Sequence, residues 1–316
     1  MTAPRQEEAL VLLGRWLSAS DYRFVTTTPA THARVNTRAG AAPARNSRDV
    51  FGWSRCFEAG LLPAQVIGWM RSGDLLDEGA LLRSRVRFSS LGDQLYAHSS
   101  YPTSDADAVF FGPDSYRFAA LIESELRRQP LQRGARILDV GCGVGPGGMV
   151  AALASDLAAP QLLLADINPR ALVHARANVA LAALGRVTCV ESDLYARAGG
   201  EFDLIVSNPP YLVDASARTY RDGGGPLGGG LSERIVAEGL ARLAPGGRLV
   251  LYTGAAIMDG GDPLFEALRA VLEQRGWPFT YRELDPDVFG EELELPAYAA
   301  ADRIAAVACV AHRPRS

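Results

Sequence analysis

The chain has 316 residues, 48% of them hydrophobic and 22% charged, and a formal net charge of −4. This length and composition allow a full hydrophobic core and predict one large domain together with a smaller one. The acidic balance argues against a protein that binds long duplex nucleic acid by charge alone, because such proteins carry a basic face. A local contact with RNA stays open.

The cysteines and the apolar runs indicate the compartment. Four cysteines lie far apart in the sequence without the spacing of a metal site, at Cys56, Cys142, Cys189 and Cys309. This pattern predicts a reducing environment with no disulfide framework and no bound metal. No apolar stretch approaches the ~20 residues that a membrane helix needs. We therefore expect a cytoplasmic protein without a membrane partner, and its oligomeric state is left open.

The N-terminal part of the chain has mostly helical periodicity. Three leucines fall on one face of a predicted helix, namely Leu10, Leu13 and Leu17. Pro63 precedes a second apolar group and is typical of a helix start. A hairpin is predicted over residues 83–98, with strands at 83–88 and 94–98 and its turn at Gly92 and Asp93. We expect residues 1–108 to form a substrate-recognition domain of helices and a hairpin, resembling a winged helix.

From about residue 109 the hydrophobic pattern alternates between strands and helices. Such alternation predicts a parallel sheet that is covered on both faces. Seven strands are expected, at 136–140, 161–165, 186–190, 202–206, 248–252, 278–282 and 303–310. Helices are expected over 169–184, with Asn168 as N-cap, and over 263–275. The fold class is therefore α/β, with a mostly parallel seven-stranded sheet over residues 109–316.

An unusual corner follows the predicted strand at 202–206. It reads Asn208-Pro209-Pro210-Tyr211. Neither proline has an amide hydrogen, and each fixes its own φ, so the strand cannot continue. The result is a rigid corner that projects the Asn208 side chain and leaves the carbonyls of Asn208 and Pro209 unpaired. Two acceptors held at a fixed separation suit a planar –NH2 group, such as an amide or an exocyclic amine.

A glycine-rich loop follows the first strand of the predicted sheet. Glycines at this place let the backbone approach a ligand closely. The stretch Gly143 to Gly148 also satisfies the dinucleotide fingerprint, and Asp166 follows Gly145 at about the interval of a ribose-binding acid. On these residues alone, an enzyme that uses a nicotinamide cofactor is a fair alternative.

Three acids at successive strand ends favour a different cofactor. Asp139, Asp166 and Asp193 end the first, second and third strands, and the Asn-Pro-Pro-Tyr corner ends the fourth. This arrangement resembles the class I methyltransferases, which have a Rossmann-like sheet and use S-adenosylmethionine. The resemblance implies that the cofactor crosses the carboxyl ends of the strands.

The same resemblance implies a role for each residue around the cofactor. Gly141, Gly143 and Gly145 would make room for its methionyl part, and the first acid would face its ammonium group. The second acid would bind the ribose hydroxyls, with Ile167 against the adenine. The third acid would accept from the adenine amino group, and the Leu194 amide would face a ring nitrogen. Asn208 is counted with the cofactor-binding and the catalytic residues.

Within this fold, the corner resembles the amino-methylating branch. That branch includes release-factor glutamine methyltransferases, RNA guanine N2 methyltransferases and adenine N6 methyltransferases of RNA or DNA. The resemblance spans roughly residues 110–310, and the segments 111–116 and 221–224 look closest to the glutamine group. It implies catalytic roles for Asn208, Pro209, Pro210 and Tyr211.

The expected chemistry is mainly positional. An amide nitrogen is a poor nucleophile because its lone pair is delocalised, whereas the sulfonium methyl is already activated. The side-chain oxygen Oδ1 of Asn208 and the backbone carbonyl of Pro209 would each accept one N–H of the substrate. This aims the lone pair of the substrate nitrogen at the methyl group. Tyr211 would stack on the flat amide or base. No strong general base is required, and the histidines are read as ordinary core or surface residues.

Three functions remain open. The first is methylation of a protein, most simply at a glutamine side chain, with the N-terminal region recognising the partner. The second is methylation of an RNA base at guanine N2 or adenine N6; a DNA enzyme is disfavoured by the acidic balance and the compact length. The third is a cofactor-binding module without catalysis.

Two further segments have weaker interpretations. The glycine-rich stretch 222–230 is read as mobile, either as a cover over the substrate or as a plain connection. The acidic segment 291–296 is read as solvated loop, with one wall of the substrate cleft as the alternative.

Overall fold

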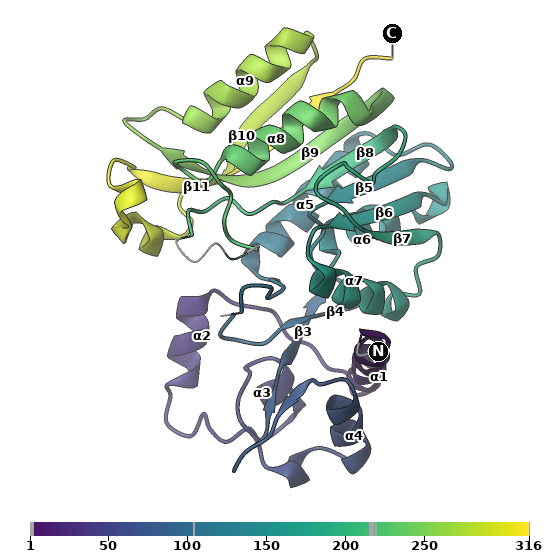
Figure 1. Ribbon diagram of the computed structural model, residues 1–316, viewed down its shortest axis with the longest axis vertical. Coiled ribbons are helices and arrows are strands. Elements are labelled where there is room, and N and C mark those ends of the chain that lie inside the picture. The colour runs from purple at the N-terminus through teal and green to yellow at the C-terminus, as the bar shows by residue number, and fades with distance from the viewer. Residues whose placement is uncertain (1–2, 104, 215–217, 219, 316) are drawn as a thin grey trace. The chain divides into compact units, whose positions relative to one another are not determined.

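The computed structural model describes residues 3–103, 105–214, 218 and 220–315 (Figure 1). The chain forms two compact units. The first contains residues 1–116, 143–146 and 169–185, and the second contains 117–142, 147–168 and 186–316. The first unit therefore takes a helix and a short loop from the later part of the sequence. A division of function at residue 108 stays a prediction.

The first unit is built from helices and two small antiparallel sheets. Its helices are α1 (Ala3–Ala19), α2 (Pro29–Asn36), α3 (Ser47–Phe51), η1 (Ala59–Leu61), α4 (Ala64–Ser72) and α7 (Pro169–Leu181). Its strands are β1 (Leu76–Asp77), β2 (Arg83–Ser84), β3 (Val86–Leu91) and β4 (Gln94–Ser99). The predicted hairpin is confirmed as β3–β4, with Leu91 opposite Gln94. The predicted start at residue 83 was wrong, because Arg83 and Ser84 pair with β1 instead.

Helices α1 and α7 share the core of this unit. Leu10, Leu13 and Leu17 have no exposed surface, as their helical spacing predicts. Gly14 allows a close approach, because a Cβ at this position would lie 2.5 Å from a side-chain carbon of Leu181. Burial of the three leucines stabilises the unit by about 1.5–3 kcal/mol each.

The second unit contains the predicted seven-stranded sheet, in the order β10-β11-β9-β8-β5-β6-β7. The strands are β5 (Arg136–Val140), β6 (Gln161–Asp166), β7 (Val187–Glu191), β8 (Phe202–Ser207), β9 (Leu243–Ile257), β10 (Phe279–Asp285) and β11 (Arg303–His312). Only β11 runs against its two neighbours; the remaining pairs are parallel. The fold class and all seven strands are confirmed.

Strand β9 is longer than the sequence predicts. Residues 245–247 form a bulge within the strand, where the register against β8 shifts. Beyond residue 252, β9 continues because it pairs with β11 along the whole of that strand.

Helices cover both faces of this sheet. They are α5 (Pro113–Arg128), α6 (Pro146–Leu153), α8 (Gly230–Gly239) and α9 (Pro263–Arg275), with short 3-10 turns η2 (Asp156–Ala158), η3 (Leu240–Arg242), η4 (Gly290–Glu294) and η5 (Pro296–Tyr298). Figure 1 shows α8 and α9 side by side over one face, where Leu249 and Leu251 join their core. On the other face, α5 places Phe118 against Tyr252, with the ring centroids 6.2 Å apart. Within the described residues, no helix has the length and apolarity required to cross a membrane.

One buried amide connects three parts of the first unit. The Oδ1 of Asn178, on α7, accepts from the backbone N–H of Ala97 at 2.7 Å. Its Nδ2 donates to the carbonyls of Ala97 at 3.2 Å and Val144 at 3.0 Å. Asn178 is fully buried, so these backbone groups have no access to water as a substitute. The side chain thus fixes β4 and the glycine-rich loop to the same helix.

We expect Asn178→Ala to lower the free energy of unfolding by about 2–4 kcal/mol, because it leaves buried backbone groups unpaired. The exposed amide of Gln65, on α4 in the same unit, offers a matched control. Gln65→Ala should change stability by less than about 0.5 kcal/mol. Urea unfolding of the two variants measures the difference, and equal values would contradict the role given to Asn178.

Candidate active site

Four parallel strands end at one edge of the sheet. Val140 of β5 is level with Ala165 of β6 and with Ser207 of β8. One residue further along β6, Asp166 is level with Glu191 of β7. Because the strands are parallel and in register, the segments that follow them leave the sheet side by side. The edge therefore gathers the acids and the corner that the sequence singles out.

The first acid, Asp139, is almost completely buried, with 1% of its surface exposed. Its Oδ2 accepts from the backbone N–H of Gly148, in the first turn of α6, at 2.7 Å. Burial raises the pKa of Asp139 from 3.8 to about 7; the Gly148 hydrogen bond lowers it, and the nearby Asp166 raises it. A positive charge bound beside this carboxyl group would favour its ionised form.

The glycine loop after β5 leaves room at the sheet edge. Gly141 has φ +65°, and a Cβ at this position would find no heavy atom within 4 Å. Gly143 has φ +55° with equally open space, and Gly145 has φ +89°. Gly143 and Gly145 belong to the first compact unit, whereas Gly141 belongs to the second. The loop therefore has a backbone conformation that disfavours side chains.

The second acid is followed by an exposed apolar side chain. The Oδ1 of Asp166 accepts from the backbone N–H of Asn168 at 2.8 Å, which forms a tight turn after β6. Ile167, between them, is 55% exposed. A large aliphatic side chain at the end of a buried strand offers an apolar surface for a ligand ring.

The third acid lies in a turn that Ser192 organises. The Oγ of Ser192 donates to the carbonyl of Leu194 at 3.0 Å and accepts from the backbone N–H of Arg197 at 3.0 Å. This fixes Leu194 at φ +45° and leaves Asp193 exposed. The sequence analysis missed Ser192, although its place directly before Asp193 was a usable signal.

The corner after β8 holds a buried acceptor. Ser207 ties β8 to β5, because its Oγ donates to the carbonyl of Val140 at 2.7 Å. The next residue, Asn208, places its Oδ1 in a buried position without a hydrogen-bond partner among the described residues. Leaving such an oxygen unpaired costs roughly 1–3 kcal/mol. An unpaired acceptor beside two prolines is suited to receive an N–H from a ligand.

The ring of Tyr211 is enclosed by protein. The residue is 7% exposed, and its ring meets Phe289 edge-on, with the centroids 5.8 Å apart at 71°. Gly254 of β9 lies beneath it, since a Cβ there would come within 2.3 Å of a ring carbon. The orientation of Tyr211 is therefore set by its neighbours, and stacking on a substrate stays a prediction.

The two segments with weaker interpretations are both held by contacts with other parts of the chain. The stretch 222–230, which was read as mobile, is hydrogen-bonded to the residue that follows the corner: the N–H of Gly223 donates to the carbonyl of Leu212 at 2.9 Å. In the acidic segment, Glu292 is buried and accepts from Arg221, so the solvated reading was wrong for this residue. Arg218 holds the pKa of Asp214 down at about 2 through hydrogen bonds.

Buried titratable groups elsewhere are structural. Burial lowers the pKa of His98 and of His174, so both are neutral core residues. Burial also raises the pKa of the Cys142 thiol well above its usual value, which argues against a nucleophile. Among the described residues, none of the four cysteines is part of a disulfide.

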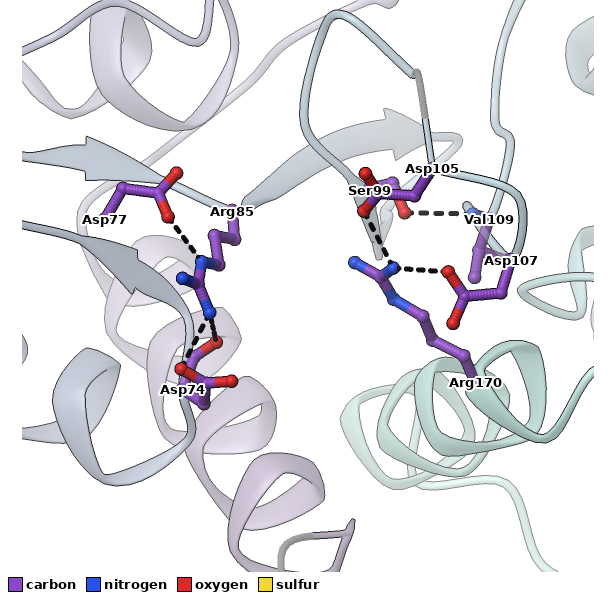
Figure 2. A network of polar contacts seen from close by, with 8 residues as sticks. All are labelled: Asp74, Asp77, Arg85, Ser99, Asp105, Asp107, Val109 and Arg170. Atoms are coloured by element: carbon purple, nitrogen blue, oxygen red, sulfur yellow. Dashed lines mark hydrogen bonds and ion pairs between the residues drawn. The ribbon is translucent and has the colours of Figure 1, made fainter.

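The first unit contains a polar cavity of about 720 Å³. Three arginines line it, namely Arg83, Arg85 and Arg170, and Figure 2 shows the last two each paired with two aspartates. Arg85 binds Asp74 and Asp77, and Arg170 binds Asp105 and Asp107, at distances of 2.6–3.0 Å, as four ion pairs. The sequence analysis missed this cavity because its residues come from separate segments that only folding brings together.

Comparison with known proteins identifies relatives of the chain. Residues 119–257 match the family described as methyltransferase small domain. A release factor glutamine methyltransferase of Deinococcus radiodurans is 35% identical over 201 residues, which cover 60% of this chain and 66% of that protein. A ribosomal RNA small subunit methyltransferase C of Actinobacillus pleuropneumoniae is 34% identical, over 47% of this chain and 41% of that protein. The chain thus spans less than two thirds of each relative.

A solved structure shares the fold. Trm5 of Methanocaldococcus jannaschii, in complex with adenosine, matches with a TM-score of 0.50 and 13% identity. The match covers 73% of this chain and 56% of that one. At this identity the likeness concerns the fold alone, and it agrees with the Rossmann-like sheet.

The raised pKa of Asp139 makes stability depend on pH. Between pH 3.8 and about 7, the folded chain holds a proton on Asp139 that the unfolded chain has lost. Stability therefore falls as the pH rises through this window. Asp139→Asn keeps an acceptor for Gly148 but cannot ionise. From about pH 5.5 to about pH 8.5, the ligand-free protein should lose about 2 kcal/mol relative to this variant.

Urea unfolding at both pH values, without ligand, measures this difference. Parallel pH profiles for the two proteins would show that Asp139 titrates normally.

Proposed function

We propose that this chain, which belongs to the class I S-adenosylmethionine-dependent methyltransferases of the Asn-Pro-Pro-Tyr group, methylates the side-chain amide nitrogen of a protein glutamine. The observation that carries the proposal is the buried Oδ1 of Asn208 at the carboxyl end of β8, which has no hydrogen-bond partner in the described part of the chain. It is an acceptor that a planar –NH2 group can satisfy.

The edge of the sheet fits the cofactor in three respects. Asp139 is a buried carboxyl whose ionised form a positive charge would favour, which suits the ammonium group of the cofactor. Exposed Ile167 suits the adenine ring, next to Asp166 for the ribose hydroxyls. Around Gly141 there is open space for the methionyl part. Bound there, S-adenosylmethionine supplies an activated methyl group on its sulfonium.

The remaining cofactor contacts complete this proposal. Asp193 and the Leu194 amide would bind the adenine edge, from the turn that Ser192 fixes. Gly143 and Gly145 would add backbone close to the ligand.

The corner would place the amide nitrogen of the substrate in line with the methyl group that is transferred. The Oδ1 of Asn208 and the carbonyl of Pro209 would each accept one N–H of the amide, which orients its lone pair. Both acceptors also stabilise the positive charge that develops on nitrogen during transfer. Pro210 and Tyr211 would complete the wall, with the ring stacking on the amide.

The nature of the substrate rests on the relatives. Release factor glutamine methyltransferases of Deinococcus radiodurans and of Koribacter versatilis are 35% and 33% identical to this chain. We propose that residues 1–108 recognise the protein partner and that residues 109–316 carry out the transfer in the cytoplasm. The relative that acts on ribosomal RNA keeps an RNA base as the second candidate.

Labelling in a cell extract tests the function. The protein is incubated with methyl-labelled S-adenosylmethionine and extract from a strain that lacks it, and the products are digested with protease or with nuclease. Label that protease releases and nuclease leaves in place supports protein methylation. Label released by nuclease favours the RNA function, and tight cofactor binding without any transfer favours a module without catalysis.

We expect Asn208→Ala to lower the rate of transfer on the order of 100-fold, as loss of one charge-stabilising hydrogen bond does. Asn208→Asp keeps an oxygen at the same place and should retain more activity than the alanine variant. Calorimetric titration should give similar S-adenosylmethionine affinities for all three proteins. A full rate with Asn208→Ala would refute the role of the side chain.

A further inference from the structure

Three glycines from two other segments lie against the corner, two of them against its backbone and one against the Tyr211 ring. A Cβ at Gly223 would lie 2.7 Å from the carbonyl oxygen of Pro210, and a Cβ at Gly228 would lie 2.4 Å from that of Tyr211. Gly254 of β9 lies under the Tyr211 ring, and a Cβ at this position would lie 2.3 Å from a ring carbon. Real Cβ contacts are not this short, so no larger residue fits without moving the corner.

Hydrogen bonds hold one of these glycines, Gly223, in place. The N–H of Gly223 donates to the carbonyl of Leu212 at 2.9 Å, and the N–H of Leu212 donates to the carbonyl of Arg221 at 3.2 Å. In turn, the carbonyl of Gly223 accepts from the N–H of Leu231, in the first turn of α8, at 2.8 Å. The corner is thereby connected to α8 through main-chain atoms.

Helix α8 and β9 are themselves fixed to each other. Ser232 of α8 and Thr253 of β9 form a hydroxyl–hydroxyl hydrogen bond of 2.8 Å, and neither residue has exposed surface. Thr253 directly precedes Gly254. The loop of residues 223–231, which contains Gly228, is therefore joined through α8 to the strand that carries Gly254.

We propose that Gly223, Gly228 and Gly254 form a glycine cradle that positions the Asn-Pro-Pro-Tyr corner for methyl transfer. This proposal rests on the proposed function, because it assigns the cradle a task in that reaction. Two acceptors can orient one amide only if their separation is held to a fraction of an ångström. The cradle supplies this constraint by holding the corner in place, without touching substrate or cofactor.

The glycine-rich stretch 222–230 also provides matched controls. Gly228 has φ +80°, Gly224 has φ +69° and Gly225 has φ +74°, so alanine is strained at all three. The space around them differs. A Cβ at Gly224 meets nothing within 4 Å, and one at Gly225 first meets an atom at 3.6 Å. Gly224→Ala thus reproduces the backbone strain of Gly228→Ala without displacing Tyr211.

The test compares the two alanine variants in the full chain. Gly228→Ala should lower kcat for label transfer into extract protein by about 100-fold, as a displacement of the reacting groups by about 1 Å does. Its affinity for S-adenosylmethionine, measured by calorimetry, should stay within about twofold of the wild type, because the corner shifts and the strand ends do not. Gly224→Ala should keep the wild-type kcat. An equal loss of kcat in both variants, or no loss of kcat in Gly228→Ala, would overturn the proposal.

Amide hydrogen exchange on the wild-type protein gives a second test that needs neither variant nor substrate. The amides of Gly223, Leu212 and Leu231 should exchange as slowly as those within α8, since a cradle requires that they stay closed. Exchange at the rate of an unprotected loop would overturn the proposal even if the enzyme is active. Conversely, slow exchange in a protein that labels nothing would leave the cradle standing and refute the methyltransferase function.

Discussion

The parallel register of β5, β6 and β8 is the constraint on which the site depends. Val140, Ala165 and Ser207 are level across three strands, so the three chain segments that follow them start at one edge. Ser207 secures this alignment because its hydroxyl donates to the carbonyl of Val140. A slip of β8 would carry the Asn-Pro-Pro-Tyr corner away from Asp139 and Asp166, and the site would lose either its acceptors or its acids.

Polar groups at this edge are arranged at the expense of stability. Asp139 is buried with one backbone hydrogen bond and a raised pKa, and the Oδ1 of Asn208 has no partner among the described residues. Each costs free energy in the isolated protein. Two unfavourable groups near the same edge are typical of a ligand site, because a cation and an N–H donor would relieve both. The apolar cores and the long pairing of β9 with β11 offset this cost in free energy.

Contacts at the corner show how the surrounding structure makes use of small residues. Gly223 and Gly228 bring main chain against main chain, and Gly254 leaves space for the Tyr211 ring. The two contacts of Gly223 and Gly228 are short because no side chain separates the segments. A stretch whose composition favours a flexible connection is thus part of the support for the site, through hydrogen bonds that run from Leu212 to α8.

The sequence alone determined the alternating strands, the seven-stranded sheet, the three acids at strand ends and the corner, because hydrophobic periodicity, glycine and proline act locally. It also placed α9 correctly, between Asp262 as N-cap and Gly276 as C-cap. Only the tertiary structure decided that Glu292 is buried against Arg221 and that the glycine-rich stretch holds the corner. It also decided that Arg85 and Arg170, which line one polar cavity, pair with aspartates there. Those pairings connect residues far apart along the chain, and their energies depend on distance and burial, which no local pattern contains.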